Sequence, residues 1–228
     1  MEHRTELYLT GNPDADALLA ADPNALLIGM VLDQQVPMEK AFSGPAVIAQ
    51  RMGGRFDVRA IADADPDRFA ALCTERPAVH RFPGAMAKRV QATCQVLVER
   101  YDADAGNLWA DVAAGDELRD RIAALPGFGA QKAAIFTALL GKQRGVQPEG
   151  WRQAAGAYGE EGSYRSVADV VDHDSLQRVR ATKKAAKAAA RQADPAAPDS
   201  AAPDDAAPDN AAPDDAAAMT PAGGGQAS

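Results

Sequence analysis

The arrangement of apolar and polar residues along the chain predicts a series of helices. Residues 25–32 are apolar at nearly every position and follow Asp22-Pro23-Asn24, a typical helix start, so we expect a buried helix there. Between residues 86 and 101 the apolar side chains recur at spacings of four, three and four, at Val90, Cys94, Leu97 and Tyr101. This periodicity predicts an amphipathic helix.

The other predicted helices are separated by proline, glycine and aspartate. A helix is expected after Pro37, with an interruption at Gly44-Pro45. Further helices are expected at residues 66–72, 107–113, 116–124 and 130–140, and one or two more at residues 166–191. Strand character is confined to Leu7-Tyr8-Leu9. The sequence therefore predicts an all-α fold.

The C-terminal part of the chain has a different composition. Residues 195–215 repeat a five-residue unit that begins Ala-Ala-Pro-Asp, and none of its side chains is large and apolar. Proline at every fifth position prevents a continuous helix, and such a composition cannot bury a core. We therefore predict one helical domain at residues 1–192 and a disordered acidic tail at residues 193–228.

The formal charge of −8 argues against nucleic-acid binding only until it is divided along the chain. All 24 Lys and Arg residues lie at or before Arg191, and seven of the 32 Asp and Glu residues lie beyond it. The predicted domain therefore carries −1, and the tail carries −7. A nearly neutral domain can still bind DNA if its cations cluster on one face.

Other features exclude several classes of protein. Cys73 and Cys94 are too few for a four-thiolate zinc or iron–sulfur site, and we expect them to be buried thiols. No apolar run is long enough for a membrane span, and the start of the chain contains no export signal. We therefore expect a cytoplasmic, monomeric protein without a metal or cofactor.

The segment Leu125-Pro126-Gly127-Phe128-Gly129 joins two predicted helices. Its two glycines permit the positive φ values of a tight helical hairpin. Backbone amides at the start of the following helix have no carbonyl one turn earlier, and such groups bind anions. The segment therefore predicts either a phosphate site or a turn whose glycines serve the backbone geometry alone.

Three segments together resemble a known family. Leu125 to Ala133 resembles the helix-hairpin-helix of the base-excision DNA glycosylases, the superfamily of endonuclease III, adenine glycosylase and alkyladenine glycosylase. Leu32-Asp33-Gln34-Gln35-Val36 resembles that family's early (S/G)QQ(T/V) segment. Gly84-Ala-Met-Ala-Lys88-Arg-Val resembles its GxxxxKAxxI helix. The segments occur in the family's order within residues 25–142.

The resemblance implies a helical DNA-binding body that flips a damaged or mispaired base out of double-stranded DNA. By this resemblance, Gln35 would fill the gap left by that base; the alternative is that Gln34 and Gln35 cap their own helix. Lys88 would neutralise a phosphate, or it is a solvated helix residue. The residues expected to contact DNA are Gln35, Lys88, Pro126, Gly127, Phe128, Gly129, Gln131 and Lys132.

Two departures from the family concern the chemistry. Family members that cut the backbone have a lysine two residues after the second hairpin glycine, where this chain has Gln131, and Lys132 follows one residue later. The family's aspartate, about eighteen residues after that lysine, corresponds to Glu149. Glu149 is the candidate catalytic residue, or else an exposed loop glutamate. These features predict a monofunctional DNA glycosylase without lyase activity.

Two observations leave alternatives open. The run from Arg178 to Arg191 contains six basic residues and no acidic one, so it is either a DNA-backbone contact or a solvated helix face. Trp109 and Trp151 either stack on a base or belong to the core. A catalytically inactive DNA-binding module and a protein-interaction scaffold are the alternative functions.

Overall fold

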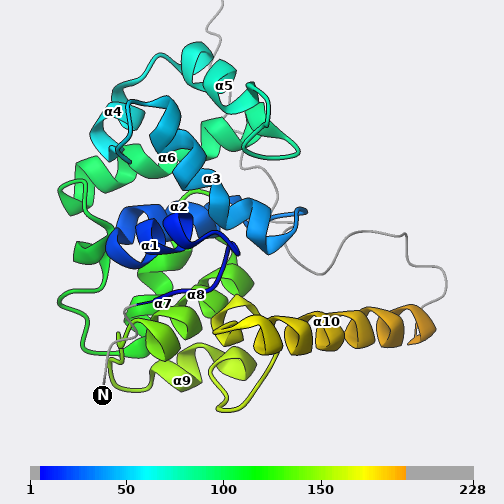
Figure 1. The fold of residues 1–228 in the computed structure, drawn as a ribbon. Helices are drawn as coiled ribbons and strands as arrows, with labels where there is room; N and C mark the ends of the chain where they lie inside the picture. The colour runs from blue at the N-terminus through cyan, green and yellow to red at the C-terminus, as the bar shows by residue number, and fades with distance from the viewer. Residues whose placement is uncertain (1–5, 194–228) are drawn as a thin grey trace, which may run out of the picture.

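The computed structural model describes residues 6–193, with side chains described through residue 189. It consists of α-helices and short 3₁₀ helices, and the described residues contain no strand. This confirms the predicted all-α class (Figure 1). The predicted acidic tail lies outside the described residues except for Ala193. The elements, in chain order, are α1 (Pro13–Ala21), α2 (Pro23–Leu32), α3 (Met38–Arg51), α4 (Val58–Asp63), α5 (Pro66–Thr74), α6 (Pro83–Tyr101), η1 (Ala105–Leu108), α7 (Gly115–Ala123), α8 (Ala130–Gln143), α9 (Trp151–Ala154), η2 (Gly156–Tyr158), η3 (Val167–Asp169) and α10 (His173–Ala193).

Helix α2 occupies the centre of the core. Asp22 caps it by accepting hydrogen bonds from the amides of Asn24 and Ala25, and every residue from Ala25 to Leu32 is buried. In Figure 1, α2 lies between the α4–α6 group and the α7–α9 group. Burial on all sides explains why its sequence lacks amphipathic periodicity.

Helix α3 corrects one prediction. It continues through Gly44-Pro45, where the sequence predicts an interruption. A Cβ atom at Gly44 would lie 2.3 Å from Leu32 Cδ1, so the missing side chain lets α3 approach α2 closely. Burial of Phe42 and Ile48 stabilises the helix and offsets the backbone hydrogen bond that Pro45 cannot donate.

The other predicted elements agree with the structure to different degrees. Helices α5, α6, α7 and α8 lie where they are expected, within a few residues. The predicted helix at residues 107–113 is wrong, because only the 3₁₀ helix η1 forms, started by the side chain of Asp104. The strand character of Leu7–Leu9 has no counterpart in the structure, where the amide of Leu9 donates to Asp16 Oδ1. Helices α1 and α4 were not predicted.

The tryptophans and cysteines belong mainly to the core. Trp151 is buried, and a Cβ atom at Gly141 would lie 2.3 Å from its indole ring. Trp109 is half-buried and packs edge-on against Phe136. Cys73 and Cys94 are buried free thiols, as predicted. Core packing, rather than base stacking, therefore accounts for Trp151.

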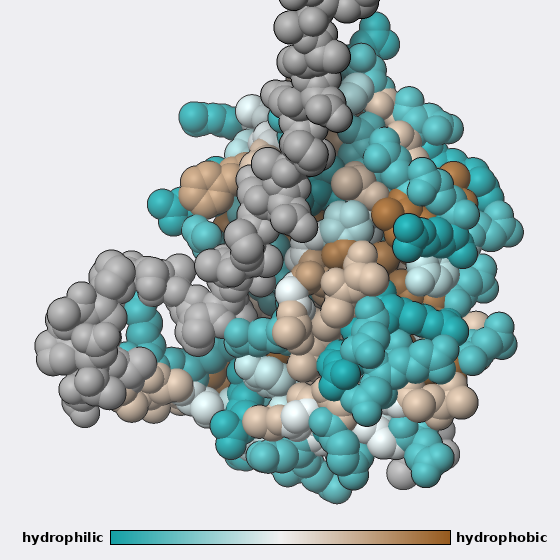
Figure 2. Space-filling model, turned by 180° about the vertical axis from the view of Figure 1, so that it is seen from behind, coloured by the Kyte–Doolittle hydropathy of each residue, from teal (hydrophilic) through white to brown (hydrophobic). Residues whose placement is uncertain are grey.

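The surface is largely polar. On the face seen in Figure 2, hydrophobic side chains form only small patches among hydrophilic ones. Among the described residues, no single helix is long and apolar enough to span a membrane. Helices α1 and α2 satisfy that criterion only as a pair bent by 115°. The same residues contain no cluster of His, Cys, Asp and Glu suited to a metal ion.

Candidate nucleic-acid interface

Helices α7 and α8 are joined by the predicted hairpin. Gly127 has a φ of +82°, as the sequence predicts. Gly129 does not, because its φ of −101° and ψ of 175° are accessible to any residue. The amide of Phe128 donates to the carbonyl of Leu125 at 3.1 Å and closes the turn. Only one of the two glycines is therefore required by the backbone geometry.

The hairpin leads directly into the N-terminus of α8. Gly129 is the N-cap residue, and no side chain in the described part of the chain caps this helix. The amides of Ala130, Gln131 and Lys132 occupy its first turn, where no earlier helical carbonyl is available. Ala130 is exposed. The helix dipole and these amides together favour an anion such as a phosphate at this point.

The glutamine loop, residues 34–36 between α2 and α3, is bound to the hairpin. Gln34 is buried, and its Nε2 atom donates to the carbonyl of Gly127 at 3.4 Å. The guanidinium of Arg89, on α6, donates to Gln34 Oε1. Gln34 therefore connects three segments that are distant in sequence, and its side chain does not cap α2.

Gln35 directly follows Gln34, whose side chain forms the bridge to the hairpin. Its side chain is exposed, and its backbone φ is +50°. A left-handed conformation is uncommon for a residue with a side chain and costs about 1–2 kcal/mol. Such strain is found preferentially at functional sites. The structure therefore presents Gln35 to solvent, next to the Gln34 side chain that is bonded to the hairpin.

His80 stabilises the same loop. Its Nδ1 accepts a hydrogen bond from the amide of Phe82 at 3.0 Å, so its Nε2 donates to the carbonyl of Gln34 at 2.8 Å. Burial lowers the pKa of His80, and the nearby cations Lys132, Lys40 and Arg89 lower it further. The ring is therefore neutral. Nothing in the sequence indicates this role for His80, because the carbonyl that its Nε2 binds lies 46 residues away.

Phe82 was not identified from the sequence. Its exposed fraction is 46%, and it is the one large hydrophobic side chain among the described residues that is classed as exposed. The guanidinium of Arg81 lies 5.1 Å from its ring centroid, and His80 lies beneath it with a centroid distance of 6.1 Å. The signal in the sequence was an aromatic residue between a cation and the proline that starts α6. An exposed aromatic ring beside cations suits base stacking.

Lys88 and Arg89 lie on the first half of α6, and both are exposed. Exposure of Lys88 is compatible with a phosphate contact and with a solvated helix position. Arg89 is bonded to Gln34, so its charge is fixed close to the hairpin. Together with Arg81, these residues give the glutamine loop and the hairpin a positively charged border.

Gln131 and Lys132 point in different directions. Gln131 Nε2 donates to Tyr158 Oη at 2.8 Å, on the side of η2. The side chain of Lys132 is buried, with Nζ 3.3 Å from the carbonyl of Val31 and 5.9 Å from the centroid of the Phe128 ring. Lys132 also lines a small cavity together with Asp33. The amine, rather than the Gln131 amide, therefore lies between the hairpin and the glutamine loop.

The expected DNA contacts in the hairpin differ in exposure. Phe128 is buried and packs against Phe136, with ring centroids 5.9 Å apart. The carbonyl of Pro126 accepts a hydrogen bond from Thr93 at 3.0 Å. Pro126, Gly127 and Gly129 are half-buried. The buried Phe128 and Lys132 side chains thus support the hairpin from within, while the glycine backbone lies nearer the surface.

The structure does not bring Glu149 to the hairpin. Its backbone pairs with Ala113 and Gly115 at the start of α7, through hydrogen bonds of 2.9 and 2.7 Å. The hairpin follows the other end of α7, about 13 Å away for a helix of nine residues. The side chain of Glu149 is exposed. Asp33 is the acidic residue adjoining the glutamine loop.

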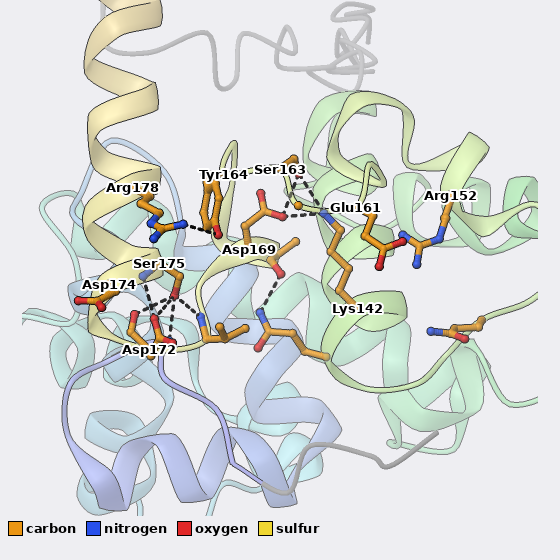
Figure 3. A pocket seen from close by; sticks show the side chains of 15 residues that line it. Lys142, Arg152, Glu161, Ser163, Tyr164, Asp169, Asp172, Asp174, Ser175 and Arg178 are labelled. Atoms are coloured by element: carbon orange, nitrogen blue, oxygen red, sulfur yellow. Dashed lines mark hydrogen bonds and ion pairs between the residues drawn. The ribbon is translucent and has the colours of Figure 1, made fainter.

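Asp169 and Asp172 have structural partners in a separate polar cavity of about 640 Å³. Figure 3 shows Asp169 beside Lys142, with Oδ1 2.6 Å from Nζ. Asp169 also accepts hydrogen bonds from Ser163 and from the amide of Arg165. Asp172 accepts from the amide of Ser175 at the start of α10. This cavity adjoins the C-terminal half of α8 and not the hairpin.

Comparison with known families gives one result. Residues 28–197 match the model of the HhH-GPD superfamily of base excision DNA repair proteins. The match spans the glutamine loop, α6, the hairpin and α10. Searches among curated proteins and solved structures gave no match.

Proposed function

The chain belongs to the HhH-GPD superfamily of base excision DNA repair proteins, and we propose that it binds double-stranded DNA and hydrolyses the N-glycosidic bond of a damaged or mispaired base. The bridge from Gln34 to the carbonyl of Gly127 carries this proposal, because it joins the exposed Gln35 to the hairpin amides. Gln35 would occupy the space of the flipped base while the amides of α8 hold a phosphate.

The surrounding side chains support the same arrangement. Arg81, Lys88 and Arg89 provide positive charge for the DNA backbone, and Phe82 offers a ring on which a base adjacent to the flipped nucleotide can stack. The neutral His80 fixes the carbonyl of Gln34, which keeps the loop in register with the hairpin.

The chemistry requires a carboxylate and a water molecule, and no protein amine. Hydrolysis breaks the bond between C1′ and the base nitrogen, the water oxygen bonds to C1′, and its proton leaves with the base. A carboxylate stabilises the positive charge that develops on the sugar. Asp33 is our candidate, because it adjoins the glutamine loop and shares a cavity with Lys132. The amine of Lys132 is buried, which favours a monofunctional enzyme.

An oligonucleotide panel tests the activity. Duplexes that each contain one damaged or mispaired base are incubated with the chain, and strand cleavage is measured with and without alkali. We expect one class of duplex to break only after alkali, and borohydride to trap no covalent adduct. A borohydride-trapped adduct that disappears in Lys132→Ala would instead identify a lyase. Duplex binding without base release by any member of the panel would favour the inactive DNA-binding module.

Two variants test which carboxylate acts. Asp33→Asn should abolish base release while duplex binding is retained, and Glu149→Gln is the matched control because it removes a carboxylate from the far end of α7. Release that depends on Glu149 and not on Asp33 would refute the assignment. Absence of duplex binding by the natural chain would favour the protein-interaction scaffold.

A further inference from the structure

Helix α10 is the longest helix in the described part of the chain, and it extends away from the body of the protein. Leu176 and Val179 are buried in its first two turns, whereas every side chain from residue 181 to residue 189 is exposed. Figure 1 shows its C-terminal half extending away from the other helices. The 21 residues correspond to a length of about 31 Å. About half of this helix therefore has no packing role in the described part of the chain.

The N-terminal part of α10 is fixed to the body by side-chain hydrogen bonds. Asp172 Oδ1 accepts hydrogen bonds from the amide and the hydroxyl of Ser175, at 2.8 and 2.7 Å. Arg178 donates to Tyr164 Oη at 2.9 Å, and its guanidinium lies 5.1 Å from the tyrosine ring centroid. Figure 3 shows these contacts at the edge of the polar cavity. The direction in which α10 leaves the body is therefore determined by specific contacts.

The cations of α10 form one stripe. Arg180, Lys183, Lys184 and Lys187 are spaced at i, i+3, i+4 and i+7, which places them on one side of the helix. Between Ser175 and Ala193 the sequence contains no acidic residue, and most other positions are alanine. Alanine keeps the segment helical without tertiary packing. With no large apolar side chain beyond Val179, the exposed half offers charge and no hydrophobic docking surface.

The stripe begins beside the candidate nucleic-acid interface. Arg180 forms an ion pair with Glu39, in the first turn of α3 and four residues after Gln35. Lys183 lines the small cavity that contains Asp33 and Lys132. The stripe therefore has one end near Gln35, at Arg180 and Lys183, and its other end in the exposed half of α10.

We propose that α10 is a cationic arm that binds the phosphates of duplex DNA beyond the segment held by Gln35 and the hairpin. The stripe spans about 10 Å from Arg180 to Lys187, a distance over which duplex DNA carries about six charges. Phosphate contacts of this kind position a protein on DNA without reading sequence. The proposal rests on the proposed function, because the arm extends an interface that Gln35 and the hairpin define.

Two triple variants of the full chain test the arm. The first replaces Lys183, Lys184 and Lys187 with glutamine. The control replaces Arg55, Arg59 and Arg100 with glutamine, which removes the same charge around α4 and the end of α6, on the other side of the body in Figure 1. Affinity is measured with undamaged duplexes of about 12 and 30 base pairs at several salt concentrations, and circular dichroism confirms equal helix content.

We expect the arm variant to bind the long duplex more weakly than the control does, with little difference on the short duplex. Loss of three phosphate contacts lowers the salt slope by about 2.7, so the difference from the natural chain should shrink roughly six-fold with each doubling of salt. A third variant adds Ala181→Lys, Ala185→Lys and Ala188→Lys to the arm variant. It restores the charge about 80–140° around the helix and should not restore the affinity.

The outcomes separate the arm from the interface. Equal affinities of the arm variant and the control for the long duplex would overturn the proposal, and the stripe would then suit an acidic protein surface. Recovery of long-duplex affinity in the third variant would also overturn the proposal, because the affinity would then depend on the net charge of the helix and not on the position of the stripe. If Gln35→Ala weakens duplex binding and the arm variant does not, the arm fails while the proposed function stands. If the natural chain binds neither duplex, the proposed function and the arm both fail.

Discussion

Replacing Gly127 with alanine separates the two possible roles of the hairpin, its geometry and its contact with DNA. At a φ of +82°, an alanine costs about 1–2 kcal/mol more than glycine. The new Cβ would lie 3.4 Å from Val31 Cγ1 and 3.8 Å from Arg89 Cδ, which are ordinary contacts, so no clash adds to this cost. The expected loss of unfolding free energy is therefore the backbone strain alone.

Gly129→Ala is the matched control for stability. With a φ of −101°, this position accepts alanine without backbone strain, and only the preference of a helix N-cap for glycine over alanine is lost, at a cost of about 0.5 kcal/mol. Its new methyl group, however, stands beside the first amides of α8, where we expect a phosphate. Gly129→Ala should therefore weaken duplex affinity with little change in stability.

The assay is urea unfolding followed by circular dichroism, combined with duplex affinity under conditions in which both variants are folded. We expect Gly127→Ala to be less stable than Gly129→Ala by about 1 kcal/mol. In a domain of this size, each kcal/mol corresponds to about 2–4 °C in Tm. Equal stabilities would refute the conformational argument. Unchanged duplex affinity in both folded variants would refute the hairpin as the DNA contact.

Three further predictions concern the body of the protein. Because the pKa of His80 is lowered in the folded chain, the unfolded chain binds more protons below about pH 6.5; stability should fall on acidification, and this fall should be smaller in His80→Gln. Gly141→Ala places a Cβ 2.3 Å from the buried indole ring of Trp151 and should lower the unfolding free energy by about 1–3 kcal/mol. Gly84→Ala is the control, because the space around Gly84 is open and the change should be neutral or stabilising. Thermal unfolding that ranks the two variants otherwise would contradict the packing. Asp169→Asn breaks a buried ion pair and should cost about 3–5 kcal/mol, while the exposed Asp174→Asn should change little; denaturant midpoints that coincide would show that the pair contributes nothing.

The sequence alone determined most of the local structure. Helix α6 follows from the periodicity of its apolar residues, and α2 from its capping aspartate and its unbroken apolar run. The hairpin was identified because proline and glycine act on the backbone within a few residues. These signals are local, so they remain visible without knowledge of the fold.

Packing decided the elements for which local rules failed. Helix α3 passes through Gly44-Pro45 because Gly44 lies against Leu32 of the neighbouring helix, and that contact cannot be seen from the residues around Pro45. At residues 107–113 the helical tendency of the sequence did not prevail, and the chain forms only η1 before α7.

The candidate site shows the same division. The sequence identified Gln35 and the hairpin through a family resemblance, but the choice of carboxylate by counting led to Glu149, which lies at the far end of α7. The bridge between Gln34 and Gly127 joins residues 93 positions apart. A contact of that separation depends on how whole helices pack around α2, because periodicity and turn chemistry act only over neighbouring residues, so only the tertiary structure could bring the glutamine loop to the hairpin.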